Sequence, residues 1–192
     1  MQELYKLIFA TSNKGKFEEA KQILKDHKIK LVMKDIKGLE IQSDNLEEIT
    51  LFSVIQAYNK FKGNVIVEDD GLFIKALKGF PGPYSSYVYK TLGLKGLLKL
   101  MEGKKNREAY FLSSLAFYNG KELKLFSGRV DGWISYEAKG DKGFGFDPIF
   151  IPKGFNKTFG ELNLEEKNKI SHRSKAFLNF SNWLSLTLYL SH

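Results

Sequence analysis

A short polar segment near the N-terminus combines residue types that bind phosphate groups in proteins. It follows an apolar run, precedes an amphipathic pattern and reads Thr11-Ser12-Asn13-Lys14-Gly15-Lys16. A turn between a strand and a helix directs backbone N–H groups and the positive end of the helix dipole toward one point, which favours a bound anion. The lysines add charge, and the hydroxyls add hydrogen-bond donors. An ordinary capped turn has a similar composition, so both interpretations stay open.

Consecutive acids form a second group with chemical potential. Glu68, Asp69 and Asp70 follow a β-branched run at residues 65–67. Carboxylates crowded at the end of an apolar strand are costly without a partner, and Mg²⁺ prefers a few carboxylates together with phosphate oxygens. One of the carboxylates could instead accept a proton from an attacking water. A solvated acidic turn is the alternative interpretation.

Further acids precede the long helical pattern that begins near residue 46. Glu47 and Glu48 fall in its predicted first turn, where acids favour the helix dipole and need no other role. Glu40 and Asp44 lie in the preceding loop, where they are freer to reach a metal ion. These two residues are therefore additional candidate metal ligands.

A loop rich in glycine and phenylalanine follows residue 139. Its residues 142–146 match the start of an RNA-recognition signature, but Asp147 stands where that signature has valine, and Pro148 cannot donate to a central sheet ladder. A single nucleobase stacked on Phe144 or Phe146 fits better, with Asp147 accepting from a ring N–H. Packing of both rings beneath the loop is the structural alternative.

The last motif is Ser171-His172-Arg173, which precedes an apolar C-terminal pattern. Ser171 is the predicted N-cap of the final helix, so His172 and Arg173 fall in its first turn. A cation in that turn opposes the helix dipole, which indicates that an anionic or carbonyl-bearing group lies nearby. The donor fork of Arg173 suits a purine carbonyl oxygen.

Strands and helices must position these motifs. Apolar patterns predict strands over residues 4–10, 29–33, 65–67, 72–77, 108–118 and 123–130, with a further short strand over 133–136. Asn119-Gly120 is a strong hairpin signal between the two longest strands. Helical periodicity predicts helices over residues 16–26, 46–62, 84–92 and 94–101, and from Ser171 onward. The sequence therefore predicts an α/β or mixed α+β fold around a mixed sheet.

The composition favours an ordered globular chain. Of its 192 residues, 43% are hydrophobic and 27% charged, which supports a sizeable core. The absence of cysteine excludes disulfides, thiolate nucleophiles and cysteine-bound zinc, and it suits a reducing cytoplasm. Neither apolar end has the length of a signal peptide or membrane span, so we expect no membrane partner. The formal net charge of +8 favours anionic partners without choosing among them.

Taken in order, these motifs resemble the inosine triphosphate pyrophosphatase family, also called HAM1-like enzymes. The resemblance spans nearly the whole chain and is also carried by Glu40-Ile-Gln42, by Gly79-Phe-Pro-Gly82 followed by Tyr84-Ser85, and by Glu165-Glu-Lys167. It implies Mg²⁺-dependent cleavage of ITP, dITP and XTP between the α- and β-phosphates, which yields a nucleoside monophosphate and pyrophosphate. It also implies one domain over residues 1–192 with an elongated mixed sheet, two lobes and a central substrate cleft, and a cytoplasmic homodimer without a nucleic-acid partner.

The resemblance also implies roles for individual residues. The triphosphate would contact Thr11, Ser12, Asn13, Lys14, Gly15 and Lys16, helped by Lys167. Asp69 would be the general base beside Lys16, and the candidate metal ligands are Glu40, Asp44, Glu68 and Asp69. The purine would contact Phe144, Gly145, Phe146, Asp147, His172 and Arg173. Asp70 stands where the family usually has Ser or Thr, so an acid replaces a donor to the substrate.

Two alternatives remain open. A non-enzymatic RNA- or DNA-binding module would explain the net charge and residues 142–146, but it leaves the acids at 68–70 without a role. A Maf-like nucleotide pyrophosphatase with another base preference is the second. The Phe-Gly-Phe-Asp and Ser-His-Arg motifs argue against it.

Overall fold

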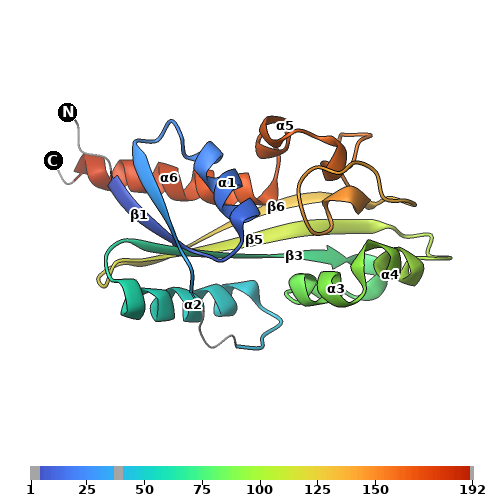
Figure 1. The fold of residues 1–192 in the computed structure, drawn as a ribbon, viewed down its shortest axis with the longest axis horizontal. Helices are drawn as coiled ribbons and strands as arrows, with labels where there is room; N and C mark the ends of the chain where they lie inside the picture. Colours follow the sequence, from blue (N-terminus) through green and yellow to red (C-terminus); the bar gives the residue numbers. More distant parts are fainter. Residues whose placement is uncertain (1–4, 37–40, 191–192) are drawn as a thin grey trace. The chain divides into compact units, whose positions relative to one another are not determined.

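The computed structural model describes residues 5–36 and 41–190 and shows a mixed α/β fold (Figure 1). Within these residues seven strands form one sheet in the order β2-β1-β3-β5-β6-β7, with β4 paired to β3. The strands are β1 (Tyr5–Ala10), β2 (Ile29–Lys34), β3 (Val65–Ile74), β4 (Pro81–Gly82), β5 (Glu108–Tyr118), β6 (Leu123–Ile134) and β7 (Phe150–Pro152). β1 pairs in parallel with β2 and β3, whereas β3–β4 and β6–β7 are antiparallel, so the predicted mixed sheet is confirmed.

Helices connect and cover the strands. The α-helices are α1 (Lys14–Ile23), α2 (Leu46–Phe61), α3 (Ser85–Thr91), α4 (Gly93–Leu100), α5 (Leu164–Asn168) and α6 (His172–Leu190). Short 3₁₀ turns are η1 (Lys75–Leu77), η2 (Asp147–Ile149) and η3 (Phe159–Glu161). No helix among the described residues is long and apolar enough to cross a membrane.

The chain divides into two compact units. Unit 1 comprises the described parts of residues 1–69, 113–128 and 173–192, and unit 2 comprises residues 70–112 and 129–172. Two boundaries between the units therefore fall inside predicted motifs. One lies between Asp69 and Asp70, and the other lies between His172 and Arg173. The acidic motif at residues 68–70 and the Ser171-His172-Arg173 motif therefore each contribute residues to both units.

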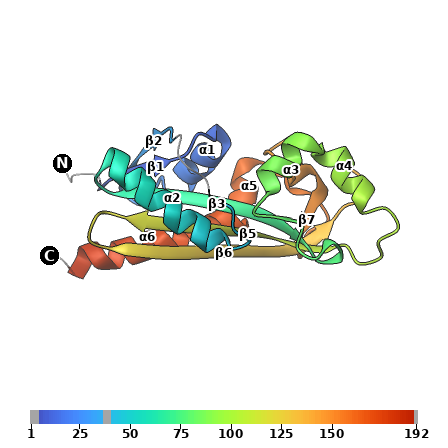
Figure 2. The ribbon, with the colours of Figure 1, turned by 90° about the horizontal axis from the view of Figure 1, so that it is seen from below.

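Unit 1 has an apolar cluster on each face of its strands. Ile66 and Phe117 pack with Phe177 of α6 and with α1 on one face. Val67 packs with Ala57 of α2 on the other. Figures 1 and 2 show α6 and α2 on opposite sides of these strands. Because neighbouring residues of a strand point to opposite faces, β3 contributes Ile66 to one cluster and Val67 to the other.

Unit 2 is built around packed aromatic rings. The ring of Phe111 on β5 lies 4.8 Å from that of Phe150 on β7, and Phe150 lies 5.3 Å from Phe159. Val88 of α3 and Leu97 of α4 join the same buried cluster. These contacts fix the segment around β7 and η3 to the sheet of unit 2.

Strand β3 differs from the sequence expectation. It continues from Val65 to Ile74 through the three acids, whereas the sequence predicted separate strands over residues 65–67 and 72–77. Gly71 permits this continuity, because a Cβ at that position would overlap the carbonyl oxygen of Gly82 on β4. All three acidic side chains are thereby carried on a strand instead of a turn.

The end of β6 also differs from the sequence expectation, whereas β5 does not. β6 extends to Ile134 and takes in the first two residues of the strand expected over 133–136, because Gly132 lets it approach the backbone of Ile151 on β7. β5 has the predicted bounds, and the side chain of Asn119 accepts N–H bonds that close the turn before β6. The residue pattern thus predicted the long strands, but it did not predict the close backbone contacts at Gly71 and Gly132 that set where strands end.

Candidate functional site

The turn after β1 is shaped by its own polar side chains. The Asn13 side chain caps α1 by accepting the Lys16 backbone N–H at 3.1 Å, and Thr11 Oγ1 accepts the Asn13 N–H at 3.1 Å. α1 therefore starts at Lys14, two residues earlier than expected. Ser12 and Lys14 are exposed. The first turn of any α-helix carries N–H groups without intrahelical partners, so this end of α1 suits a phosphate.

Lys16 brings the turn motif and the acids together. Its Nζ lies 3.1 Å from Glu68 Oε2 and 3.5 Å from Asp69 Oδ1, and it also donates to the Glu68 carbonyl oxygen at 3.3 Å. The Glu68 side chain is fully buried, whereas the Asp69 side chain is 33% exposed. The predicted convergence of Lys16 and Asp69 is therefore confirmed. Asp69 is the accessible carboxylate of the cluster, and Glu68 is the interior one.

Arg173 lies in the interior of unit 1 with two acids. Its guanidinium forms an ion pair with Glu19 of α1, and its Nε lies 3.3 Å from Glu68 Oε1. The arginine is 0% exposed and Glu19 is 3% exposed. The sequence motif suggested a purine contact for Arg173, but the structure shows its charge balanced by buried carboxylates.

Sequence reasoning missed Glu19 and Ser113 as members of this cluster. Glu19 lies on the same face of α1 as Lys16, Ala20 and Ile23. A charged residue on a predicted buried face could have indicated that it pairs with another buried charge. Ser113 Oγ donates to Glu68 Oε1 at 2.6 Å from the middle of β5. Its only signal was a hydroxyl inside an apolar strand.

Unit 1 offers two carboxylates, those of Glu68 and Asp69, as candidate metal ligands. Among the described residues, no three His, Asp or Glu side chains gather closely enough to hold a metal ion by themselves. Asp44 is exposed in the loop before α2, and Glu40 lies outside the described residues. Mg²⁺ is usually bound through one or two carboxylates plus substrate phosphates, so Glu68 and Asp69 fit that mode. Glu68 Oε2 is buried, and its neighbour is Lys16 Nζ at 3.1 Å, so this oxygen faces the cationic side of the cluster where a metal ligand is expected.

A second polar cluster lies in unit 2, under the glycine-rich loop. Asp147 Oδ2 accepts the Phe144 N–H at 2.8 Å and the Lys167 Nζ at 2.7 Å. Both charged side chains are nearly buried, at 4% and 3% exposure. Lys167 Nζ also lies 4.9 Å from the centre of the Phe144 ring. The structure thus places Lys167 with the expected base-binding residues of unit 2.

The two phenylalanines of the loop have different surroundings. Phe146 is 3% exposed, belongs to the aromatic core of unit 2 and meets the Tyr89 ring edge-on at 5.5 Å. Phe144 is only partly buried, and Gly145 beside it has a left-handed backbone with φ +61°. Phe144 is therefore the ring with a face able to stack on a planar ligand, whereas Phe146 supports the loop from below.

His172 lies at the start of α6 within unit 2. Its ring stacks on Phe111 at 4.7 Å with an interplanar angle of 10°, and its Nε2 lies 3.5 Å from Asp70 Oδ2. The side chain is 2% exposed, and its Nδ1 makes no hydrogen bond to any described residue. A buried ring nitrogen without a hydrogen bond is costly and needs an explanation. A hydrogen bond to a bound ligand would provide one.

We expect Gly143→Ala to weaken nucleotide binding without unfolding the protein. Gly143 has φ +73°, and an added Cβ would overlap the Asp147 carboxylate. The carboxylate must then shift away from Lys167 and the Phe144 N–H. An increase in KM of about tenfold for the preferred nucleotide, equal to about 1.4 kcal/mol, is the expected result. Steady-state kinetics measure it, and Gly154→Ala is the matched control, because its φ is also positive but no neighbour lies within contact distance.

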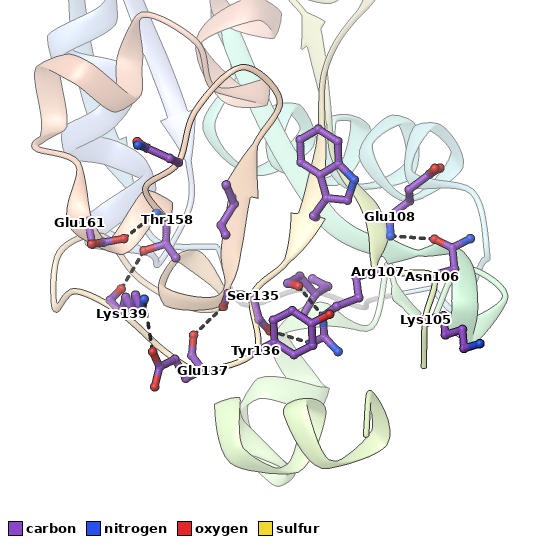
Figure 3. Close-up of a pocket in the computed structure, with 14 residues that line it drawn as sticks. Lys105, Asn106, Arg107, Glu108, Ser135, Tyr136, Glu137, Lys139, Thr158 and Glu161 are labelled. Carbon is purple, nitrogen blue, oxygen red and sulfur yellow. Dashed lines mark hydrogen bonds and ion pairs between the residues drawn. The ribbon is translucent and has the colours of Figure 1, made fainter. Parts of the chain in front are cut away.

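Unit 2 also contains a cavity that none of the predicted site residues lines. Its volume is about 740 Å³, and its walls include Arg107, Tyr136 and Thr158 (Figure 3). The Arg107 guanidinium lies 4.4 Å from the Tyr136 ring and donates to the backbone carbonyls of Ile134 and Ser135. Arg107 therefore holds the end of β6 through backbone hydrogen bonds.

Comparison with known proteins places the chain in a family. The model of the Ham1 family matches residues 7–183. A protein of Thermococcus kodakarensis named dITP/XTP pyrophosphatase is 49% identical over 95% of this chain and 99% of its own length. A protein of Saccharolobus solfataricus with the same name is 51% identical over 93% of each chain.

Solved structures agree with this assignment. The Ham1 protein of Staphylococcus aureus matches with a TM-score of 0.80 and 30% identity, covering 94% of this chain and 98% of its own. A HAM1 protein of Coxiella burnetii matches with a TM-score of 0.83 and 26% identity, covering 95% of this chain and 99% of its own. On its sequence, its fold and the motifs that its two units carry, the chain belongs to the Ham1 family.

Proposed function

We propose that this chain hydrolyses the deaminated purine nucleoside triphosphates dITP, ITP and XTP to nucleoside monophosphates and pyrophosphate. The observation that carries the proposal is the meeting of Lys16 with Glu68 and Asp69 at the N-terminal end of α1. The family relatives named dITP/XTP pyrophosphatase support the choice of substrate. Neither a nucleic-acid-binding module nor a Maf-like enzyme explains both this cluster and the similarity to the dITP/XTP pyrophosphatases.

In the proposed reaction, unit 1 binds the polyphosphate and activates water. Lys16 and the N–H groups at the start of α1 offset the negative charge that would repel an attacking oxygen. Asp69 accepts the proton of a water that attacks the α-phosphorus, while the bond to the bridging oxygen breaks and pyrophosphate leaves. The partial exposure of Asp69 allows water to reach it.

Mg²⁺ is the proposed cofactor. Glu68 and Asp69 would hold it, together with oxygens of the substrate. When bound, the ion neutralises phosphate charge and stabilises the leaving group. Glu40 and Asp44 stay candidate ligands on the sequence evidence.

Unit 2 is proposed to recognise the base. Hypoxanthine and xanthine carry a 6-oxo group and an N1–H, and adenine lacks both. The Asp147–Lys167 pair offers an acceptor beside a donor, His172 adds a ring nitrogen, and the Phe144 ring offers a stacking face. Adenine would leave buried polar groups unpaired, which a site of this kind strongly rejects.

Two further properties follow from family membership and are proposed on that ground. We propose that the protein is a homodimer, which light scattering on the purified chain would measure. We also propose a cytoplasmic location, because the nucleotide pool that contains the proposed substrates is found there.

The decisive experiment is a panel of nucleotides assayed for pyrophosphate release with Mg²⁺. We expect kcat/KM for dITP and XTP to exceed that for dATP by about 100-fold or more, because dATP leaves the polar groups of unit 2 unpaired. Chelation of the metal should abolish the activity. Equal rates on dITP and dATP would contradict the proposed specificity, and release of orthophosphate alone would contradict the proposed bond cleavage.

A further inference from the structure

The two oxygens of the Glu68 carboxylate have different surroundings. Oε1 accepts a hydrogen bond from Ser113 Oγ at 2.6 Å and lies 3.3 Å from Arg173 Nε. Oε2 lies 3.1 Å from Lys16 Nζ, in the cluster that includes Asp69. One oxygen is therefore held by the interior of unit 1, and the other faces the cluster proposed to bind metal and phosphate.

Ser113 is set up to hold that carboxylate. It is 0% exposed and shares a strand face with Leu115 and Phe117 of the apolar cluster around α6. A buried hydroxyl on such a face is costly unless it is hydrogen-bonded, and its bond is to Glu68. The neighbouring Ser114 points to the other face of β5, where its Oγ lies 2.7 Å from Thr50 Oγ1 of α2. Two adjacent buried serines thus serve different elements.

We propose that Ser113 is a positioning residue that holds the Glu68 carboxylate so that Oε2 is presented to Mg²⁺. Rotation of the carboxylate would break the short hydrogen bond to Ser113 and leave a buried donor and acceptor unpaired. Partners of this kind, which touch a ligand residue but not the metal, typically contribute 10–100-fold to metal affinity. The inference rests on the proposed function for the role of the metal, although metal binding can be measured without any substrate.

The experiment titrates the full-length, metal-free protein with Mn²⁺ as a stand-in for Mg²⁺ and reads free Mn²⁺ by electron paramagnetic resonance. Ser113→Ala should raise the Mn²⁺ dissociation constant about 10–100-fold. Ser113→Thr keeps the hydroxyl and should restore most of the affinity. Ser114→Ala, the matched control, removes an equally buried hydroxyl one residue away and should bind Mn²⁺ as the wild type does.

The kinetic counterpart separates positioning from packing. Ser113→Ala should raise the Mg²⁺ concentration needed for half-maximal rate, while KM for dITP at saturating Mg²⁺ stays near the wild-type value. Circular dichroism checks that each variant is folded. If Ser113→Ala does not fold, Ser113→Cys keeps nearly the same volume with a weak donor and should show the same direction of change.

Three results would overturn the inference: Mn²⁺ affinity unchanged in folded Ser113→Ala or Ser113→Cys, equal losses in the Ser113→Ala and Ser114→Ala variants, or no Mn²⁺ binding by the wild type. Failure of the proposed function looks different. A wild-type protein that binds Mn²⁺ but releases no pyrophosphate from dITP or XTP would contradict the activity, while the comparison of serine variants would still decide the role of Ser113.

Discussion

Replacing Asp69 with Asn is expected to lower kcat for dITP by about 10²–10⁴-fold while the protein stays folded. Asn has nearly the same shape as Asp but cannot accept the proton of the attacking water. The side chain is one-third exposed, so its packing contributes little to stability. Lys16 loses one ionic partner but keeps the Glu68 carboxylate and carbonyl oxygen within reach. Pyrophosphate release at saturating dITP and Mg²⁺ measures the rate, and a thermal melt measures the fold.

The matched control is Asp131→Asn, which neutralises an exposed strand aspartate whose ion pair is with Arg129. We expect it to retain the wild-type rate, because surface ion pairs contribute little and Asp131 has no proposed role. A near-normal rate in the Asp69→Asn variant would show that another group takes the proton. Glu68→Gln would then be the next variant to assay, since Glu68 is the other carboxylate at Lys16.

The meeting of Lys16 and Asp69 could be anticipated from the sequence because both belong to short, strongly patterned segments. β1 pairs in parallel with the first residues of β3, Val65 and Ile66, so the turn after β1 and the acids after this paired stretch follow neighbouring strands in the same direction. Carboxyl ends of parallel strands lie at the same edge of a sheet, where open α/β folds bind their ligands. The family resemblance implied this pairing, and the apolar runs with the polar residues after them are consistent with it.

Other parts of the site depend on contacts that no local pattern encodes. Arg173 and Glu19 are 154 residues apart, and neither segment indicates the other as its partner. The continuity of β3 through its acids depends on the close approach of Gly71 to Gly82, which becomes visible only when β4 is placed. Ser113 resembles any small residue of a buried strand until Glu68 is seen beside it. Local chemistry was predictable here, whereas the pairing of buried polar groups required the fold.

The buried arginine of the Ser-His-Arg motif leads to the second large effect. We expect Arg173→Met to lower the free energy of unfolding by about 3–5 kcal/mol, because it removes the cation paired with buried Glu19 and leaves Glu68 with Lys16 alone. Methionine keeps an unbranched side chain of similar length, so lost packing contributes little. Urea denaturation of the substrate-free protein measures this change directly.

A double-mutant cycle with Glu19→Gln identifies the origin of that loss. Because Arg173 and Glu19 are in direct contact, their effects should not be additive, and the double variant should be more stable than the sum of the single losses predicts. A purine-binding role alone gives the opposite pattern: additive, small changes in stability and a large rise in KM for dITP. If Arg173→Met unfolds at the wild-type urea concentration but loses dITP affinity, the arginine leaves its carboxylates to bind the base. If stability falls as expected and the Glu19→Gln background rescues it, the cation of this motif acts mainly by holding the acids of unit 1 in place.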